Sequence, residues 1–257
     1  MDKKYIFFVD VDETLIETGK TDLAENIIQE IDRLKRDGHI FVVSTGRAMD
    51  SLLAVKGIEV FQYLSFLLGQ CIYQTKDKKF LKAPDALPKE DVLKLVNFFT
   101  LSHRRWSYKN INLEKTMFKD FEFLRKQKTV KFIDEDEYLK DLNEGNILQM
   151  LVEGYLTKKE EKSFKNISFI PMPLNYTDIT LKTASKARCI EFFKQMYPGY
   201  ITVSIGDSNN DIPMFENTDI SIAMGNSNPE IKSLTTYVTK NINEDGFIYA
   251  FRNILKL

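Results

Sequence analysis

The feature that most constrains the fold is a short apolar segment near the start of the chain that ends abruptly in two carboxylates. Residues 5–9 are all apolar or aromatic, and Asp10 and Asp12 follow at once. An apolar run without alternation is typical of a strand that is buried on both faces, as in parallel sheets covered by helices. The segment therefore predicts a strand of a parallel sheet with Asp10 and Asp12 at its carboxyl end.

Strand and helix patterns alternate on both sides of a different middle region. A helix is expected from Asp22, with Glu25 completing a capping box, to a stop at Gly38. A second buried strand follows at 40–43, which gives a right-handed βαβ unit. Alternating helix and strand patterns return over residues 186–223. These patterns predict an α/β core with a parallel sheet.

The middle of the chain has another character, which begins near Ala83 and Pro84. Residues 84–178 mix helical and strand patterns and contain no carboxylate pair like the one after the first strand. This mixture indicates an inserted α+β lobe. We therefore expect a core domain made of residues 1–83 and 179–257, with residues 84–178 as an inserted domain.

Charge and hydropathy exclude some classes of partner. The 257 residues include 36 basic and 37 acidic side chains, a net charge of -1, whereas a protein that grips a nucleic-acid backbone usually has a basic excess. No apolar run approaches the roughly 20 residues that cross a bilayer. Cys71 and Cys189 lie far apart and indicate free thiols in a reducing compartment. We expect a cytoplasmic monomer or homodimer that binds neither nucleic acid nor membrane.

Polar residues follow the predicted buried strands at the points where those strands end: Asp10, Asp12, Thr45, Asp207 and Asp211. Sites in open α/β sheets form at the carboxyl ends of strands, so these side chains can converge. Each short motif alone is more often a turn, a helix cap or a surface feature. Their combination in this order is much more specific.

The residue types suit phosphoryl transfer. A carboxylate such as Asp10 can attack phosphorus if a cation offsets the approach of two anions, and a second carboxyl can move the proton. Mg²⁺ suits a carboxylate-rich site, for which Asp207 is a further ligand. Lys186 can stabilise the transferring phosphoryl group, and the Thr45 hydroxyl can hold its oxygens.

Four segments resemble, in order, the motifs of haloacid dehalogenase (HAD) superfamily phosphatases of the Cof-like branch. They are Phe8–Leu15, Val42–Arg47, Ser185–Ala187 and Gly206–Asp211. Two further stretches, Ala223–Asn226 and Asn243–Phe247, also fit this branch. The resemblance implies a Rossmann-like parallel-sheet core with a large inserted α+β cap. Glu13 departs from the pattern, because it stands where the family most often has Gly.

The resemblance also implies roles for individual residues. Asp10 would be the nucleophile and Asp12 the general acid and base, with Thr45 and Lys186 completing the catalytic set. The ligands of Mg²⁺ would be Asp10, the Asp12 backbone carbonyl, Asp207 and Asp211, with Asp211 supporting either the metal or the lysine. The expected contacts to substrate come from Thr45, Gly46, Arg47, Lys186 and Asn210.

The resulting expectation is a Mg²⁺-dependent phosphatase of small phosphorylated metabolites, sugar phosphates first, that works through an aspartyl-phosphate intermediate. The same motifs would serve a phosphomutase or phosphotransferase, and a catalytically silent binding protein on this fold is a third reading. Within the cap, the segment His103–Lys109 is a candidate for contacts to the leaving alcohol, although solvated basic side chains are the more common reading of such a segment.

Overall fold

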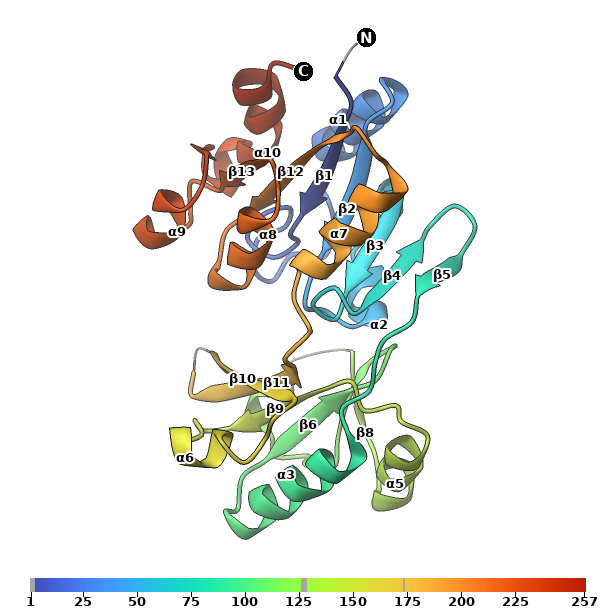
Figure 1. Cartoon of the computed structure of the whole chain (residues 1–257), viewed down its shortest axis with the longest axis vertical. Coiled ribbons are helices and arrows are strands. Elements are labelled where there is room, and N and C mark those ends of the chain that lie inside the picture. The colour runs from blue at the N-terminus through green and yellow to red at the C-terminus, as the bar shows by residue number, and fades with distance from the viewer. Residues whose placement is uncertain (1–2, 126–128, 173) are drawn as a thin grey trace. The chain divides into compact units, whose positions relative to one another are not determined.

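The structure is a computed structural model that describes residues 3–125, 129–172 and 174–257. Residues 1–2, 126–128 and 173 fall within the expected domains but lie outside the described residues. The chain divides into two compact units (Figure 1). We call Met1–Arg47, Leu52–Ala83 and Ser185–Leu257 the core unit, and Ala48–Ser51 with Pro84–Ala184 the insert.

The core unit is built on an eight-stranded sheet with the order β14-β13-β12-β1-β2-β3-β4-β5. The six strands from β14 to β3 run parallel, and β4 and β5 add an antiparallel edge. This arrangement confirms the α/β class with a parallel-rich sheet. The strands are β1 (Tyr5–Val9), β2 (Ile40–Ser44), β3 (Tyr63–Phe66), β4 (Cys71–Gln74), β5 (Lys79–Lys82), β12 (Ile201–Gly206), β13 (Ile220–Ala223) and β14 (Tyr237–Val238).

Helices cover both faces of the core sheet, which explains why every residue of the central strand β1 is buried. On one face the rings of Phe8 and Phe193 lie 5.9 Å apart, so α7 (Ala187–Met196) packs there together with α8 (Ile212–Glu216). On the other face Phe7 packs edge-on against Phe251 at 4.8 Å, in the C-terminal helical segment. The remaining helices of this unit are α1 (Glu25–Arg36), α9 (Pro229–Ser233) and α10 (Gly246–Tyr249), and α2 (Met49–Leu53) straddles the division between the units.

The start of α1 differs from the sequence prediction. The N-cap residue is Ala24, which makes no side-chain cap, and the expected capping box at Asp22 is wrong. Asp22 instead forms a β-bridge with Lys56 and an ion pair with its ammonium at 3.3 Å, which keeps the residue extended. The expected stop is correct, since Gly38 adopts a φ of 84° two residues after the helix ends.

The insert is a six-stranded sheet with helices on both faces, and its strand order is β10-β11-β9-β6-β7-β8. Trp106 and Tyr108 are fully buried there with side chains from α3 and α5. The expected boundary at 178/179 falls inside β11, which pairs along its whole length with β10. The elements are α3 (Lys89–Leu101), β6 (Trp106–Lys109), β7 (Glu114–Thr116), α4 (Glu122–Arg125), β8 (Val130–Phe132), α5 (Glu135–Asn143), β9 (Gln149–Glu153), α6 (Lys158–Glu161), β10 (Ile167–Met172) and β11 (Tyr176–Leu181).

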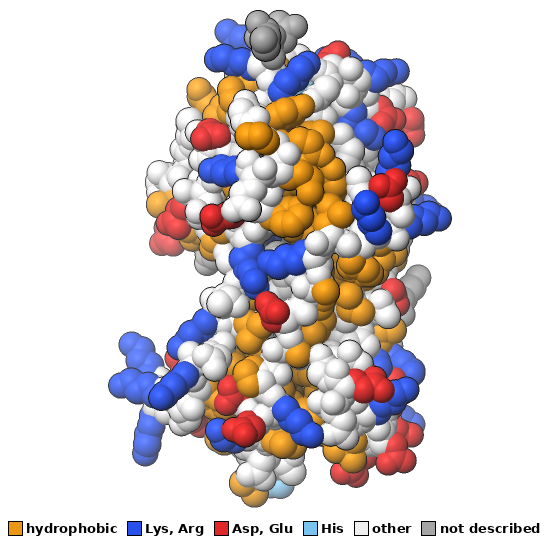
Figure 2. All heavy atoms as spheres, turned by 45° about the vertical axis from the view of Figure 1, so that its right-hand side comes forward, with side chains coloured by type: hydrophobic (Ala, Val, Ile, Leu, Met, Phe, Trp, Pro, Cys, Tyr) orange, Lys and Arg blue, Asp and Glu red, His pale blue; other side chains and the backbone are white. Residues whose placement is uncertain are grey.

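The surface carries both charges. Positive and negative side chains are mixed over most of the face drawn in Figure 2, in keeping with the net charge of -1. Among the described residues, no helix combines the length and the apolar character that a membrane span requires.

Candidate active site

Three carboxylates meet at the carboxyl ends of two adjacent parallel strands of the core sheet. Asp10 directly follows β1, Asp207 directly follows β12, and Asp211 lies in the short 3-10 turn after β12. The Asp10 amide donates to the Ile205 carbonyl at 3.0 Å, which extends the pairing of β1 and β12 by one residue. One carboxylate oxygen from each of the three aspartates lies within 4.8 Å of the others. Such a group of oxygen ligands could hold a divalent metal ion.

Lys186 brings a positive charge into this acidic group. Its side chain is fully buried, and its Nζ lies 2.6 Å from Asp10 Oδ1 and 2.6 Å from Asp211 Oδ1. The same ammonium donates to Asn210 Oδ1 at 3.0 Å. Burial alone would lower the pKa of Lys186, but the charges of Asp10 and Asp211 outweigh it and raise that pKa. Lys186 is therefore a fixed cation in contact with the Asp10 carboxylate.

Burial and mutual repulsion make the acidic group costly to ionise. Burial raises the pKa of Asp10, against the attraction of Lys186, and the charge of Asp211 adds to the effect. Burial, with the charge of Asp211, also raises the pKa of Asp207 from its ordinary value of 3.8 to about 7. A bound cation would relieve both effects, because it favours the charged form of each carboxyl.

Asp211 is held rigidly by the turn that it closes. Its Oδ2 accepts hydrogen bonds from the amides of Asp207 at 2.9 Å and Ser208 at 3.0 Å. The backbone of Gly206 passes close to this carboxylate, since a Cβ at Gly206 would lie 2.5 Å from the Asp211 Cγ. Glycine is therefore required at the end of β12, which gives a physical reason for the Gly-Asp pair in this motif.

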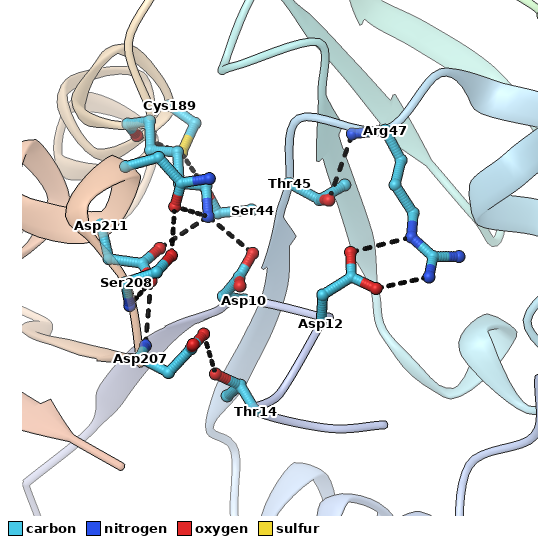
Figure 3. A network of polar contacts seen from close by, with 12 residues as sticks. Asp10, Asp12, Thr14, Ser44, Thr45, Arg47, Cys189, Asp207, Ser208 and Asp211 are labelled. Atoms are coloured by element: carbon cyan, nitrogen blue, oxygen red, sulfur yellow. Dashed lines mark hydrogen bonds and ion pairs between the residues drawn. The ribbon is translucent and has the colours of Figure 1, made fainter. Parts of the chain in front are cut away.

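Asp12 lies apart from the acidic group and pairs with Arg47. The guanidinium donates to both carboxylate oxygens, from Nε at 3.0 Å and from Nη2 at 2.6 Å. Figure 3 shows the Asp12 carboxylate turned toward Arg47. The Asp12 side chain is 54% exposed, in contrast to the buried Asp10. Nothing in the sequence pattern indicated this ion pair, because the two residues belong to different motifs.

Thr45 and Gly46 form the turn after β2. Thr45 is 1% exposed, and its amide donates to the Ser65 carbonyl at 3.0 Å. Its Oγ1 accepts a hydrogen bond from the Arg47 amide at 3.2 Å. A Cβ at Gly46 would lie 3.5 Å from the Leu68 side chain, so Gly46 is in ordinary contact with its surroundings. The turn thus places Thr45 beside the strand end that carries Asp10.

Two residues that the sequence analysis did not assign to the site support its loops. Thr14 Oγ1 donates to Asp207 Oδ1 at 3.3 Å, and Asn226 Nδ2 donates to the Glu13 carbonyl at 2.9 Å. Glu13 has a φ of 56°, the left-handed conformation that favours glycine, which explains why Gly is common there in the family. The Glu13 carboxylate accepts hydrogen bonds from the Thr18 amide and hydroxyl at 2.7 and 2.6 Å, which help to hold this turn.

Within the segment His103–Lys109, the side chains of Arg104, Arg105 and Trp106 contact other residues of the insert. Trp106 is 1% exposed and packs in the hydrophobic core of the insert. Arg105 forms ion pairs with Asp120 and, at 3.3 Å, with Glu153, while the Arg104 guanidinium lies 5.3 Å from the centre of the Phe98 ring. Trp106 is thus a core residue rather than an exposed aromatic platform.

Comparison with known proteins agrees with this fold. Residues 7–251 match the family model of haloacid dehalogenase-like hydrolases. YkrA of Bacillus subtilis (strain 168) is 27% identical over 99% of this chain and 98% of its own. The 5-amino-6-(5-phospho-D-ribitylamino)uracil phosphatase YitU of the same strain is 25% identical over 95% of each chain. A solved HAD subclass IIB sugar phosphatase, BT4131, shares the fold with a TM-score of 0.76 and 20% identity over 99% of this chain and 100% of its own.

The family match spans nearly the whole chain, and Asp10, Lys186, Asp207 and Asp211 from three of the four motifs meet in one polar site. The chain therefore belongs to the haloacid dehalogenase-like hydrolases, as a phosphatase of the Cof-like branch.

Proposed function

We propose that the protein is a Mg²⁺-dependent phosphatase of small phosphorylated metabolites that works through an aspartyl-phosphate on Asp10. The observation that carries the proposal is the contact between the Asp10 carboxylate and the buried ammonium of Lys186 at the carboxyl end of β1. A nucleophile held beside a fixed cation is suited to an anionic substrate, because the cation offsets the repulsion between the two anions.

The donor set of the site fits Mg²⁺. Asp10, Asp207 and Asp211 offer hard carboxylate oxygens within 4.8 Å of one another, and no sulfur or nitrogen ligand belongs to this described group. We propose that Asp10 and Asp207 would hold the ion, together with the Asp12 backbone carbonyl, and that Asp211 supports the site through Lys186. When bound, the ion would offset the negative charge of the phosphate.

The proposed reaction has two steps. An Asp10 carboxylate oxygen forms a bond to phosphorus while the bond from phosphorus to the leaving oxygen breaks, and Asp12 gives its proton to that oxygen. Water then attacks the aspartyl-phosphate, Asp12 takes a proton from the water, and the bond between phosphorus and Asp10 breaks. Lys186 and Thr45 bind the phosphoryl oxygens in both steps. Asp10 is thereby regenerated and inorganic phosphate leaves.

The ion pair with Arg47 bears on the role of Asp12. In this ion pair the Arg47 guanidinium occupies both carboxylate oxygens of Asp12. We propose that a substrate phosphate competes for the Arg47 guanidinium, which frees the Asp12 carboxyl to reach the leaving oxygen. Arg47, Gly46 and Asn210 are the further proposed contacts to the substrate.

The first substrates to test are sugar phosphates and related polyol phosphates. YitU is named for a phosphorylated ribityl compound, and BT4131 is described as a sugar phosphatase. Purified protein should release phosphate from members of such a panel when Mg²⁺ is present and lose this activity after exhaustive chelation. Undiminished turnover after chelation would contradict the metal requirement, and Asp10→Asn protein serves as the inactive control.

Product analysis separates hydrolysis from phosphoryl transfer between sugars. A phosphatase releases inorganic phosphate in proportion to substrate consumed, whereas a mutase or phosphotransferase returns an isomeric or new ester. Inactivity of the wild-type protein on the whole panel would favour a binding protein on this fold.

A further inference from the structure

A groove on the insert lies beside β10, the strand at one edge of its sheet. The groove has a volume of about 580 Å³, and residues of α6 and β10 help to line it. Two of its lining side chains are aromatic, and their rings meet edge-on with centroids 5.5 Å apart. We call it the β10 groove, and its walls include Lys158, Lys162, Lys165, Lys182, Phe164 and Phe169.

Lysine side chains give the β10 groove a positive charge. Its lining contains four lysines and one acidic residue, Glu161, which is an excess of three positive charges. All four lysines are exposed, and none of their ammonium groups has a hydrogen-bond or ion-pair partner among the residues that the structure describes. The neighbouring Glu160 is directed to the start of α6, where its carboxylate accepts a hydrogen bond from the Thr157 amide at 2.5 Å. Unpaired cations gathered in one groove attract an anionic partner.

The backbone of β10 offers a second means of binding. β10 pairs with β11 along its whole length, and no other described strand pairs with it, so its outer side is a free edge. At such an edge every second residue directs its N–H and C=O groups away from the sheet, where another strand can pair with them. Ser168 and Phe169 belong to both β10 and the groove, and Met172 at the end of the strand is 38% exposed. An extended chain in the groove can therefore reach the free edge.

The two features together select the kind of partner. An extended polypeptide can pair with the edge of β10 and also place carboxylates beside the lysines. A nucleic acid would meet the lysines but could not extend the sheet, and Phe164, which is only 8% exposed, offers no open ring face for a base. A second copy of this chain paired through β10 would bring two sets of lysines together, which is unfavourable.

We propose that the β10 groove binds an extended acidic segment of a partner protein, which adds to the insert sheet as a strand beside β10. Side chains alternate between the two faces of a strand, so a segment with a carboxylate at every second residue would direct its charges to one side. The main-chain hydrogen bonds supply affinity, and the four lysines select acidic segments over basic ones.

The probe for this proposal is a fluorescein-labelled octapeptide of alternating glutamate and valine, somewhat longer than the 6 residues of β10. It should bind the full-length protein in an anisotropy titration at low ionic strength, and the affinity should fall as salt is added. The same peptide with lysine in place of glutamate should not bind. Equal binding of the two peptides would overturn the proposal.

Substitutions in the groove test the part played by the lysines. Lys162→Gln and Lys182→Gln should each weaken binding of the acidic peptide by about two- to fivefold, the range for exposed ion pairs, and the double variant by more than either alone. Lys140→Gln, the same charge change on an exposed residue of α5, is the matched control and should leave the affinity unchanged. Equal effects of the groove and control substitutions would contradict a site at β10.

Methylation of the peptide backbone tests strand addition. Only alternate amides of an added strand face β10, so N-methylation of one alternate set should abolish binding, whereas the other set should be tolerated. The bound peptide should also slow amide hydrogen exchange within residues 167–172. If both methylated peptides bound alike and exchange in β10 stayed unchanged, the attraction would be electrostatic alone and the proposal would be overturned.

The alternative occupants of the groove give different results in the same assays. Tighter binding of an octamer of uridylate than of the acidic peptide, without protection of β10, would replace the proposal by a nucleic-acid site. Protection of β10 that rises with protein concentration in the absence of peptide would show that a second copy occupies the edge, and would also overturn it.

Discussion

Asp207 should destabilise the metal-free protein at neutral and alkaline pH, and its replacement by Asn should relieve this cost. The folded protein holds a proton on Asp207 up to about pH 7, whereas the unfolded chain releases it near 3.8. Between these values the folded state binds more protons, so the free energy of unfolding falls as the pH rises. The difference between these two pKa values lowers the free energy of unfolding by at most about 4 kcal/mol at pH 8 and above.

The Asp207→Asn substitution would keep an acceptor for the Thr14 hydroxyl, which bonds Asp207 Oδ1 at 3.3 Å, so it mainly removes the charge. In chelator at pH 8.5 the Asp207→Asn protein should therefore be more stable than wild type by up to about 4 kcal/mol, and the difference should vanish near pH 4. With saturating Mg²⁺ the order should reverse, because a bound ligand stabilises only the protein that holds it well.

Amide hydrogen exchange of β1 and β12, measured across pH 5–8.5, reports the free energy of unfolding of the core unit. Asp219→Asn is a control of opposite sign. Hydrogen bonds from the Thr202 amide and hydroxyl outweigh burial and lower the pKa of Asp219, so its charge contributes stability above its ordinary pKa and the variant should lose stability at pH 8.5. If Asp207→Asn in chelator were no more stable than wild type at pH 8.5, the assignment of Asp207 as a charge that needs a cation would be refuted.

Three further substitutions test the site. Lys186→Met should cost about 3–5 kcal/mol in urea unfolding, because it leaves buried carboxylates without their partner, whereas Lys194→Met on the exposed side of α7 should cost far less. Asp12→Asn should slow hydrolysis of an alkyl phosphate by about 10²–10⁴-fold, measured as steady-state phosphate release. Gly206→Ala should weaken stabilisation by Mg²⁺ in thermal unfolding, since the new Cβ would displace the Asp211 carboxylate that holds the Asp207 amide; an unchanged shift would refute the close packing.

Local signals predicted the elements that build the core. Residues 5–9 form β1 and residues 40–43 lie in β2, because continuous apolar runs have few alternatives to a doubly covered strand. Gly38 ends α1 as expected, because its positive φ is available to glycine without strain. Asp22 failed as a cap because a β-bridge to Lys56, which no local pattern reveals, holds it extended.

The site was predicted in part for the same reason. Asp10 and Asp207 follow apolar strands, so topology alone brings them to one edge of the sheet. The ion pair of Arg47 with Asp12 depends on side-chain directions, which strand and helix periodicity does not encode.

The most direct test of the account is to identify the residue that carries the phosphoryl group. Asp12→Asn protein should form the intermediate from a radiolabelled aryl phosphate, whose leaving group needs little protonation, and should hydrolyse it slowly so that it accumulates. Radioactivity in the rapidly quenched protein would measure the intermediate, and borohydride reduction, which expels the phosphate and converts the phosphorylated aspartate to homoserine, would mark its position for peptide mass spectrometry. The account expects modification of Asp10 alone, with none in the Asp10→Asn, Asp12→Asn double variant. Label on a serine, threonine or histidine, or label that persists in the double variant, would contradict it.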